Sequence, residues 1–174
     1  VSYLQTLECM FSGCSNAEKI DLSGVSGMKN APAITNMFYN CKKVKEIIFP
    51  QNEILFGNVK SFSQLFYGDE SLTSLDLSMF NTEQTTYTGS MFSGNKKLEY
   101  VNFTNWNLKS LKWADSMFNG CESLTSVVLD NFGGTSLYTF DNLFKNCISL
   151  EYISMKNFQV DPTYSSFYNS EIFY

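Results

Sequence analysis

The residues of this 174-residue sequence that could do chemistry are five cysteines, many serines and several aspartates, and histidine is absent. All 12 basic residues are lysines, so arginine is absent as well. The sequence therefore lacks the commonest general base and metal ligand, and also the side chain that clamps phosphate with two parallel hydrogen bonds. With a net charge of −5, these absences disfavour most hydrolases, zinc enzymes, phosphoryl-transfer enzymes and nucleic-acid-binding proteins.

Four of the five cysteines share one position of an internal repeat, three residues after a recurring phenylalanine: Cys14, Cys41, Cys121 and Cys147. Asp69 and Asn95 occupy the same position in two other repeats, and the cysteine count is odd, so a disulfide framework is disfavoured. Neighbouring repeats packed through helices would stand ~8–10 Å apart, beyond the ~7 Å Cα separation that a disulfide tolerates. Without a Cys-x-x-Cys pair there is also no zinc signature. We predict packed free thiols, no metal site and no cofactor.

The serines and aspartates do not form a catalytic arrangement in the sequence. Serines such as Ser74 and Ser126 have no histidine to activate them as nucleophiles. Asp21 and Asp76 share a repeat position but are two repeats apart, with Ile48 at that position in the repeat between them. We therefore expect no catalytic residues and no enzyme.

A repeat of 26 to 28 residues organises the chain. A Met-Phe or Leu-Phe pair recurs, with its phenylalanine at Phe11, Phe38, Phe66, Phe92, Phe118 and Phe144, and Ile172-Phe173-Tyr174 could begin a seventh copy. Apolar residues follow each phenylalanine at offsets of six, nine, eleven and fourteen residues, with Ile54 expected at the last of these positions in the longer second repeat. Self-similarity of this kind predicts units that stack on one another to bury a shared core.

The apolar spacing within each repeat predicts two short elements. Offsets nine and eleven are apolar and the residue between them is mostly polar, as in Leu75-Asp76-Leu77, which predicts a half-buried strand. Upstream of the phenylalanine, apolar residues recur every three or four positions after a polar residue such as Asn58 or Ser110, which predicts a capped helix or 3₁₀ segment. Strands of successive repeats would form one parallel sheet with a spacing of ~4.8 Å.

Two segments carry a resemblance to a known family. Leu72, Leu75 and Leu77 follow the Leu-x-x-Leu-x-Leu pattern, and residues 65–82 and 117–127 resemble the BspA-like leucine-rich repeats of bacterial, and some protozoan, surface proteins. The resemblance implies an α/β repeat fold: a leucine-rich-repeat solenoid of about six coils, with one short parallel strand and one short helix or 3₁₀ segment in each repeat of about 26 residues. Residues 1–174 would form this single solenoid, as a fragment of a longer chain. Asp69 and Asn95 depart from the family pattern, which has cysteine there.

The outward-facing strand positions are the candidate recognition surface, because in such solenoids they line the concave face. The candidate partner-binding residues there are Ile48, Tyr100, Asn102, Val128 and Tyr152. The resemblance implies a cell-surface or secreted adhesion module that binds a protein or glycan on a host or neighbouring cell, with its export signal and anchor outside this sequence. No nucleic acid and no membrane insertion are expected. The alternative is a set of structural spacer repeats that display another domain and have no ligand of their own.

Overall fold

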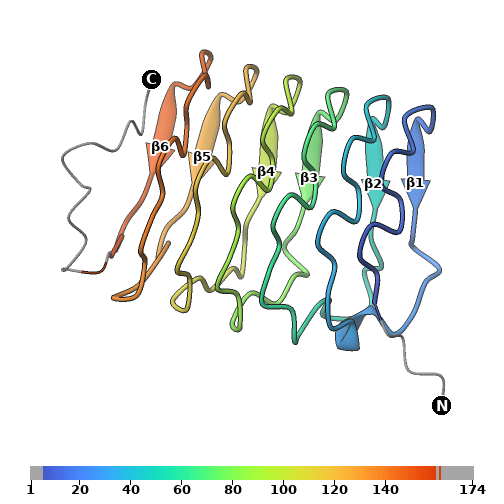
Figure 1. The fold of residues 1–174 in the computed structure, drawn as a ribbon, viewed down its shortest axis with the longest axis horizontal. Helices are drawn as coiled ribbons and strands as arrows, with labels where there is room; N and C mark the ends of the chain where they lie inside the picture. Colours follow the sequence, from blue (N-terminus) through green and yellow to red (C-terminus); the bar gives the residue numbers. More distant parts are fainter. Residues whose placement is uncertain (1–5, 160, 162–174) are drawn as a thin grey trace.

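The chain forms one short parallel strand in each repeat. The structure, a computed structural model, describes residues 6–159 and 161, so the seventh copy predicted at 172–174 lies outside the described residues. The repeats stack side by side along the long axis of the molecule (Figure 1). The elements are β1 (Lys19–Asp21), the 3₁₀ helix η1 (Met28–Asn30), β2 (Glu46–Ile48), β3 (Ser74–Asp76), β4 (Tyr100–Asn102), β5 (Ser126–Val128) and β6 (Tyr152–Ser154).

The predicted strands are confirmed, each beginning one residue earlier than the apolar pair suggested. In β3 the central Leu75 is buried while Ser74 and Asp76 are exposed, and β1 has the same alternation. Consecutive side chains of a strand point to opposite faces, so one face covers the core and the other meets solvent. Short parallel strands, one per repeat, are consistent with a leucine-rich-repeat fold.

The prediction of a short helix or 3₁₀ segment in every repeat is wrong, because the described residues contain only one such element. Within the described residues the only helix is η1, and no helix there is long and apolar enough to cross a bilayer. Around each recurring phenylalanine the backbone instead makes a run of turns, because the residues two before and two after it have positive φ, as at Asn36 (58°) and Asn40 (57°). A helix needs consecutive residues in the right-handed region, so a left-handed residue at every fourth position prevents it.

These turns form a hydrogen-bonded ladder between repeats, which we call the turn ladder. The N–H groups of Phe38 and Asn40 donate to carbonyls of the next repeat, at N···O distances of 3.0 and 2.7 Å. The intervening N–H groups, such as that of Tyr39, donate to the carbonyl three residues earlier in their own repeat. Successive turns of this kind share the three-residue apolar period of a 3₁₀ helix, which is why the sequence pattern suggested one.

The phenylalanines on the turn ladder form the centre of the core. Five successive ring pairs, from Phe11–Phe38 to Phe118–Phe144, are stacked with centroids 5.2–5.6 Å apart. Such offset-stacked contacts add to the burial of apolar area. Because the inner rings from Phe38 to Phe118 touch their equivalents on both sides, one continuous core runs through the stack.

The strands do not form the single sheet that was predicted. They pair as β1–β2, β3–β4 and β5–β6, and no strand pairing joins β2 to β3 or β4 to β5; the pairs are visible in Figure 1. Whether two neighbouring strands pair correlates with the type of residue at offset eleven of the first repeat. It is leucine in the repeats whose strand pairs with the next strand (Leu22, Leu77, Leu129), and phenylalanine, Phe49 and Phe103, in the two repeats where pairing fails.

The two offset-eleven phenylalanines act as wedges between repeats. The Phe49 ring packs edge-to-face on Phe38 of its own repeat and Phe66 of the next, with centroids 5.9 and 6.4 Å apart. Phe103 lies against Phe92 and Phe118 in the same way, at 5.9 and 6.0 Å. A ring needs more room than leucine, so the strands beside it stand too far apart to bond.

The second repeat also places a different residue in the core than was predicted. Ile54, expected at offset fourteen, is 55% exposed, whereas Leu55 is fully buried. Leu55 forms an isolated parallel bridge with Phe80, which holds the offset-fourteen position of the third repeat. The prediction was therefore off by one residue, because the extra residues of this repeat shift its register.

Truncating a central phenylalanine should destabilise the protein more than truncating a terminal one. We expect Phe92→Ala to lower the free energy of unfolding by about 3–5 kcal/mol, because it leaves a cavity between fully buried rings on both sides. Phe11→Ala is the matched control, since Phe11 is half-buried and stacks on Phe38 alone among the described rings. Urea denaturation followed by circular dichroism measures both; equal losses would contradict the continuous core.

Candidate binding surface on the strand face

The five predicted binding residues lie on the outward face of four strands. Ile48 is on β2, Tyr100 and Asn102 are on β4, Val128 is on β5 and Tyr152 is on β6. The side chains of Tyr100, Val128 and Tyr152 are each more than half exposed, while Ile48 and Asn102 are half-buried. The structure brings Tyr100, Asn102 and Val128 together around one hollow, which includes neither Ile48 nor Tyr152.

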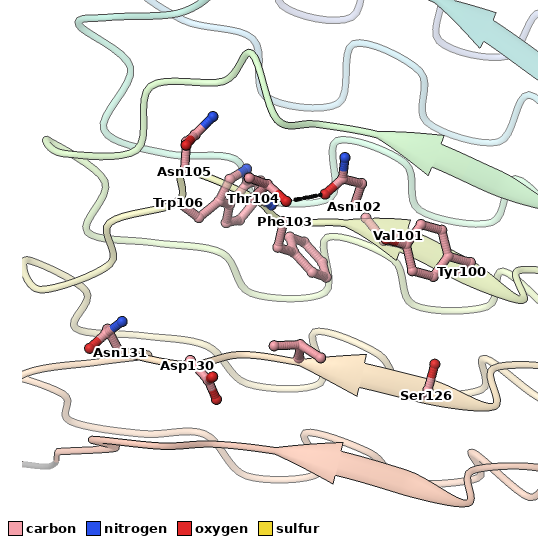
Figure 2. A pocket seen from close by; sticks show the side chains of 11 residues that line it. Tyr100, Val101, Asn102, Phe103, Thr104, Asn105, Trp106, Ser126, Asp130 and Asn131 are labelled. Carbon is pink, nitrogen blue, oxygen red and sulfur yellow. Dashed lines mark hydrogen bonds between the residues drawn. The ribbon is translucent and has the colours of Figure 1, made fainter.

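This hollow lies between β4 and β5, where the strand ladder is broken. It has a volume of about 380 Å³, and its walls come from the two strands and the turns that follow them (Figure 2). Tyr100, Asn102 and Thr104 line it from the β4 repeat, and Ser126, Val128 and Asp130 line it from the β5 repeat. The wedge residue Phe103 is also part of the lining. The ring that separates β4 from β5 therefore forms part of the wall of the hollow between them.

Hydrogen bonds fix the polar side chains of the β4 wall. The Asn102 amide nitrogen donates to Asp76 Oδ1 on β3 at 3.0 Å, and Asn102 Oδ1 accepts from the backbone N–H of Thr104 at 3.0 Å and from its hydroxyl at 2.7 Å. Figure 2 shows the Asn102–Thr104 contact. A side chain held in this way presents a fixed polar edge and loses little rotamer freedom when a ligand binds.

On the β5 wall Asp130 is an ionised carboxylate with one oxygen engaged. Its Oδ1 accepts from the Ser154 hydroxyl at 2.6 Å and from the Lys156 N–H at 2.9 Å, and Oδ2 takes no part in these bonds. The Ser154 hydrogen bond, followed by that of Lys156, holds the pKa of Asp130 below its usual range. The wall therefore offers a charged acceptor at neutral pH.

Several residues of this surface were missed by the sequence argument. Trp106 was predicted to be buried, yet it is half-buried, lines the hollow, and donates from its indole N–H to the Leu77 carbonyl at 2.9 Å. Asn105 and Asn131, both with positive φ, complete the rim. The alternation of leucine and phenylalanine at offset eleven was the sequence signal that could have located the hollow.

Three of the four repeated cysteines are held as protonated thiols by burial. All five are free, with Cys41 and Cys121 buried, Cys147 half-buried, and Cys9 and Cys14 exposed, so the prediction of packed thiols fails at Cys14. Burial raises the pKa of Cys41 to about 12 and that of Cys147 to about 11, so both stay protonated. Their Sγ atoms lie 3.1 and 3.0 Å from phenylalanine carbonyls of the preceding repeat, and each thiol donates to one.

The distance argument against disulfides was wrong, because the turn ladder spaces the repeats as a sheet does. Backbone hydrogen bonds of 2.7–3.0 Å join the repeats on both sides of Cys41 and Cys121. Strand-like spacing of ~4.8 Å lies within the Cα range of a disulfide. In the structure the cysteines are free, and the thiols of Cys41, Cys121 and Cys147 donate to backbone carbonyls.

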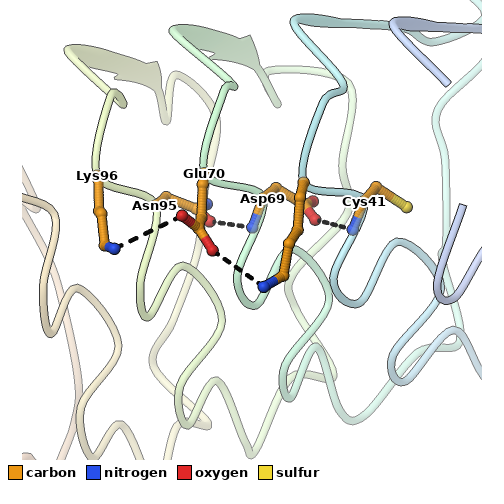
Figure 3. Close-up of polar contacts among 6 residues, drawn as sticks. Cys41, Asp69, Glu70, Asn95 and Lys96 are labelled. Atoms are coloured by element: carbon orange, nitrogen blue, oxygen red, sulfur yellow. Dashed lines mark hydrogen bonds and ion pairs between the residues drawn. The ribbon is translucent and has the colours of Figure 1, made fainter. Parts of the chain in front are cut away.

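Asp69 and Asn95 occupy the cysteine position in the third and fourth repeats, and both are buried. The Cys41 N–H donates to Asp69 Oδ1 at 2.7 Å, and the Asp69 N–H donates to Asn95 Oδ1 at 2.8 Å (Figure 3). Asp69 Oδ2 and the Asn95 amide nitrogen have no partner in the structure. Burial raises the pKa of Asp69 to about 8, although the Cys41 N–H opposes the shift, so this carboxyl is largely protonated at neutral pH.

Next to this buried pair, on the solvent side, lies a cluster of three charged side chains. Glu70 lies between Lys42 and Lys96, at 3.3 and 3.5 Å, and thereby links three successive repeats (Figure 3). The Lys42 hydrogen bond is the main cause that lowers the pKa of Glu70. All three side chains are more than a third exposed, so these ion pairs contribute little to stability.

The protein should lose stability as pH rises, because of Asp69. The unfolded chain releases this proton near pH 3.8 and the folded chain near pH 8, so each pH unit between them favours unfolding by about 1.4 kcal/mol. We expect Asp69→Asn to remove this slope and to be more stable than the wild type at pH 8.

Thermal unfolding from pH 4 to pH 9 measures this effect. Asp76→Asn, which changes an exposed strand carboxylate, is the control and should retain the wild-type slope. Identical pH profiles for the wild type and Asp69→Asn would show that the Asp69 carboxyl is not held protonated.

Comparison with known proteins gives a family and one similar solved structure. Residues 32–158 match the family described as "Mycoplasma protein of unknown function, DUF285". A leucine-rich repeat protein from Bacteroides ovatus is similar in structure, with 21% identity and a TM-score of 0.44 over 86% of this chain; the match spans 40% of that protein. No curated protein matches the sequence.

Proposed function

The chain belongs to the DUF285 family, and we propose that it is a leucine-rich-repeat solenoid of about six coils, with repeats of the BspA-like type. Its function is to bind a protein or glycan through the concave strand face. Its place is outside the cell, secreted or attached to a surface, and its partner is on a host or neighbouring cell. It carries out no reaction of its own.

One observation carries this proposal: apolar side chains gather where a strand face in water would carry polar ones. Tyr100, Val128 and Tyr152 are 53%, 52% and 56% exposed and lie on three consecutive strands. Tyrosine supplies a large contact area together with a hydroxyl, and is enriched among residues that dominate binding energy. Exposed apolar side chains that cluster in this way are typical of an interaction site.

The chemistry of the chain supports binding rather than catalysis. The wall residues of the hollow hold their polar groups through hydrogen bonds to neighbouring repeats, as Asn102 and Asp130 do. Within the described residues no cluster of three or more candidate ligands could hold a metal ion. The strand face has a fixed shape and fixed hydrogen-bonding groups, which suit the binding of a partner.

Removing the exposed tyrosines should weaken attachment to cells. We expect the double variant Tyr100→Ala/Tyr152→Ala to bind epithelial or bacterial cell surfaces at least tenfold more weakly than the wild type, because each residue loses an exposed ring that can be buried by a partner. Flow cytometry of fluorescently labelled protein on a panel of cell types measures the binding.

Tyr138→Ala is the matched control, since Tyr138 is 55% exposed but lies outside the strands. It should leave binding unchanged. Undiminished binding by the double variant would exclude the strand face as the binding surface. A wild-type protein that binds no cell, glycan or protein on the panel would instead favour the spacer function.

A further inference from the structure

The gap between β4 and β5 exposes backbone groups that a paired sheet would satisfy. Strand residues alternate the edge toward which their N–H and C=O groups point, so β4, paired with β3 on one edge, turns the other edge toward β5. The facing edge of β5 is in the same position, because β5 pairs with β6. Strand edges that lack a pairing strand present their N–H and C=O groups to water or to a ligand.

The equivalent gap between β2 and β3 has apolar residues at two outward positions of the β2 repeat. Ile48 is half-buried and Pro50 is buried at the positions that Asn102 and Thr104 hold in the β4 repeat. The wedge residues are the same, Phe49 and Phe103. The two gaps therefore differ at these positions, which are apolar in the β2 repeat and polar in the β4 repeat.

The lining of the second gap combines neutral polar groups with aromatic surface. Besides the single carboxylate of Asp130, the polar side chains are hydroxyls and amides, and no lysine is among the lining residues: Tyr100, Asn102, Thr104, Asn105, Trp106, Ser126, Asp130 and Asn131 supply the polar and aromatic atoms. Figure 2 shows them on the two strands and their following turns. A lining without cations disfavours phosphates and other anions.

The gap is too narrow for an added peptide strand. A strand inserted between β4 and β5 would need two spacings of ~4.8 Å, or about 9.6 Å in total, whereas Cα atoms of β4 and β5 come within 8 Å of each other. Binding by strand addition is thereby excluded at this place. A ligand that enters the gap must therefore be more compact than a peptide strand.

We propose that the hollow between β4 and β5 binds a neutral saccharide. The sugar lies with its hydroxyl groups toward Asp130 and the amide and hydroxyl side chains of the two walls. The Tyr100 ring at the rim covers the C–H face of the sugar. A hollow of about 380 Å³ is within the size range of small-molecule sites. This inference rests on the proposed function and names the chemical class of the partner.

Phe103 has a defined part in this site, because it keeps the hollow open. In the repeats with leucine at offset eleven, the next strand pairs and no gap forms, as at Leu77 between β3 and β4. The variant Phe103→Leu should therefore let β4 and β5 pair, and close the hollow without changing any polar residue in it. Phe49→Leu makes the same substitution at the other gap and is the matched control.

Isothermal titration calorimetry of the full chain tests the proposal. The probes are glucose, galactose, mannose and N-acetylglucosamine, with N-acetylneuraminic acid as the anionic comparison. We expect at least one neutral sugar to bind with a Kd of roughly 0.1–10 mM and the anionic sugar to bind more weakly. Phe103→Leu and Tyr100→Ala should each weaken binding at least tenfold, and Phe49→Leu should not.

The outcomes separate this inference from the proposed function. Absence of binding by all four neutral sugars overturns it, as does unchanged binding by a Phe103→Leu variant whose circular dichroism and melting temperature show that it is folded. If the protein attaches to cells but the sugars neither bind nor compete, the saccharide site fails while the binding function of the strand face stands. If cell attachment fails as well, the proposed function also falls.

Discussion

Each repeat carries backbone groups that only its neighbour can satisfy. Around the core phenylalanines from Phe11 to Phe118, alternate N–H groups bond within the repeat, and the rest donate to the next repeat, as from Phe38 and Asn40. A repeat alone would leave these donors, and both faces of its phenylalanine, exposed to water. Cooperation between neighbours on the turn ladder is thus the condition on which the strands, the core and the surface all depend.

The turn ladder keeps its spacing where the strands do not. Centroid distances along the phenylalanine stack are 5.3 and 5.2 Å across the two strand breaks, no longer than elsewhere in the stack. The wedges Phe49 and Phe103 therefore act on the strand side alone. Phe103 packs mainly against core rings, and by separating β4 from β5 it also produces the hollow on the surface.

The position three residues after each core phenylalanine accepts different side chains. It holds cysteine in four repeats, aspartate in one and asparagine in one. Asp69 and Asn95 each accept a hydrogen bond from the N–H of the equivalent residue in the preceding repeat, whereas the thiols of Cys121 and Cys147 donate to backbone carbonyls. The carboxyl of Asp69 differs because its charge is disfavoured by burial, which makes this one position sensitive to pH.

The sequence by itself determined the repeat, its phase, the six strands and the residues that alternate between core and surface, because these depend on apolar spacing within a single unit. It also placed Tyr100, Asn102 and Val128 on one face. Only the tertiary structure decided that turns replace helices and that the strands pair in twos. Both depend on bonds between repeats, which the apolar spacing of one unit does not record. For the same reason, the site at Asp130, Ser126 and Trp106 emerged only once the wedge of Phe103 between neighbouring repeats was seen.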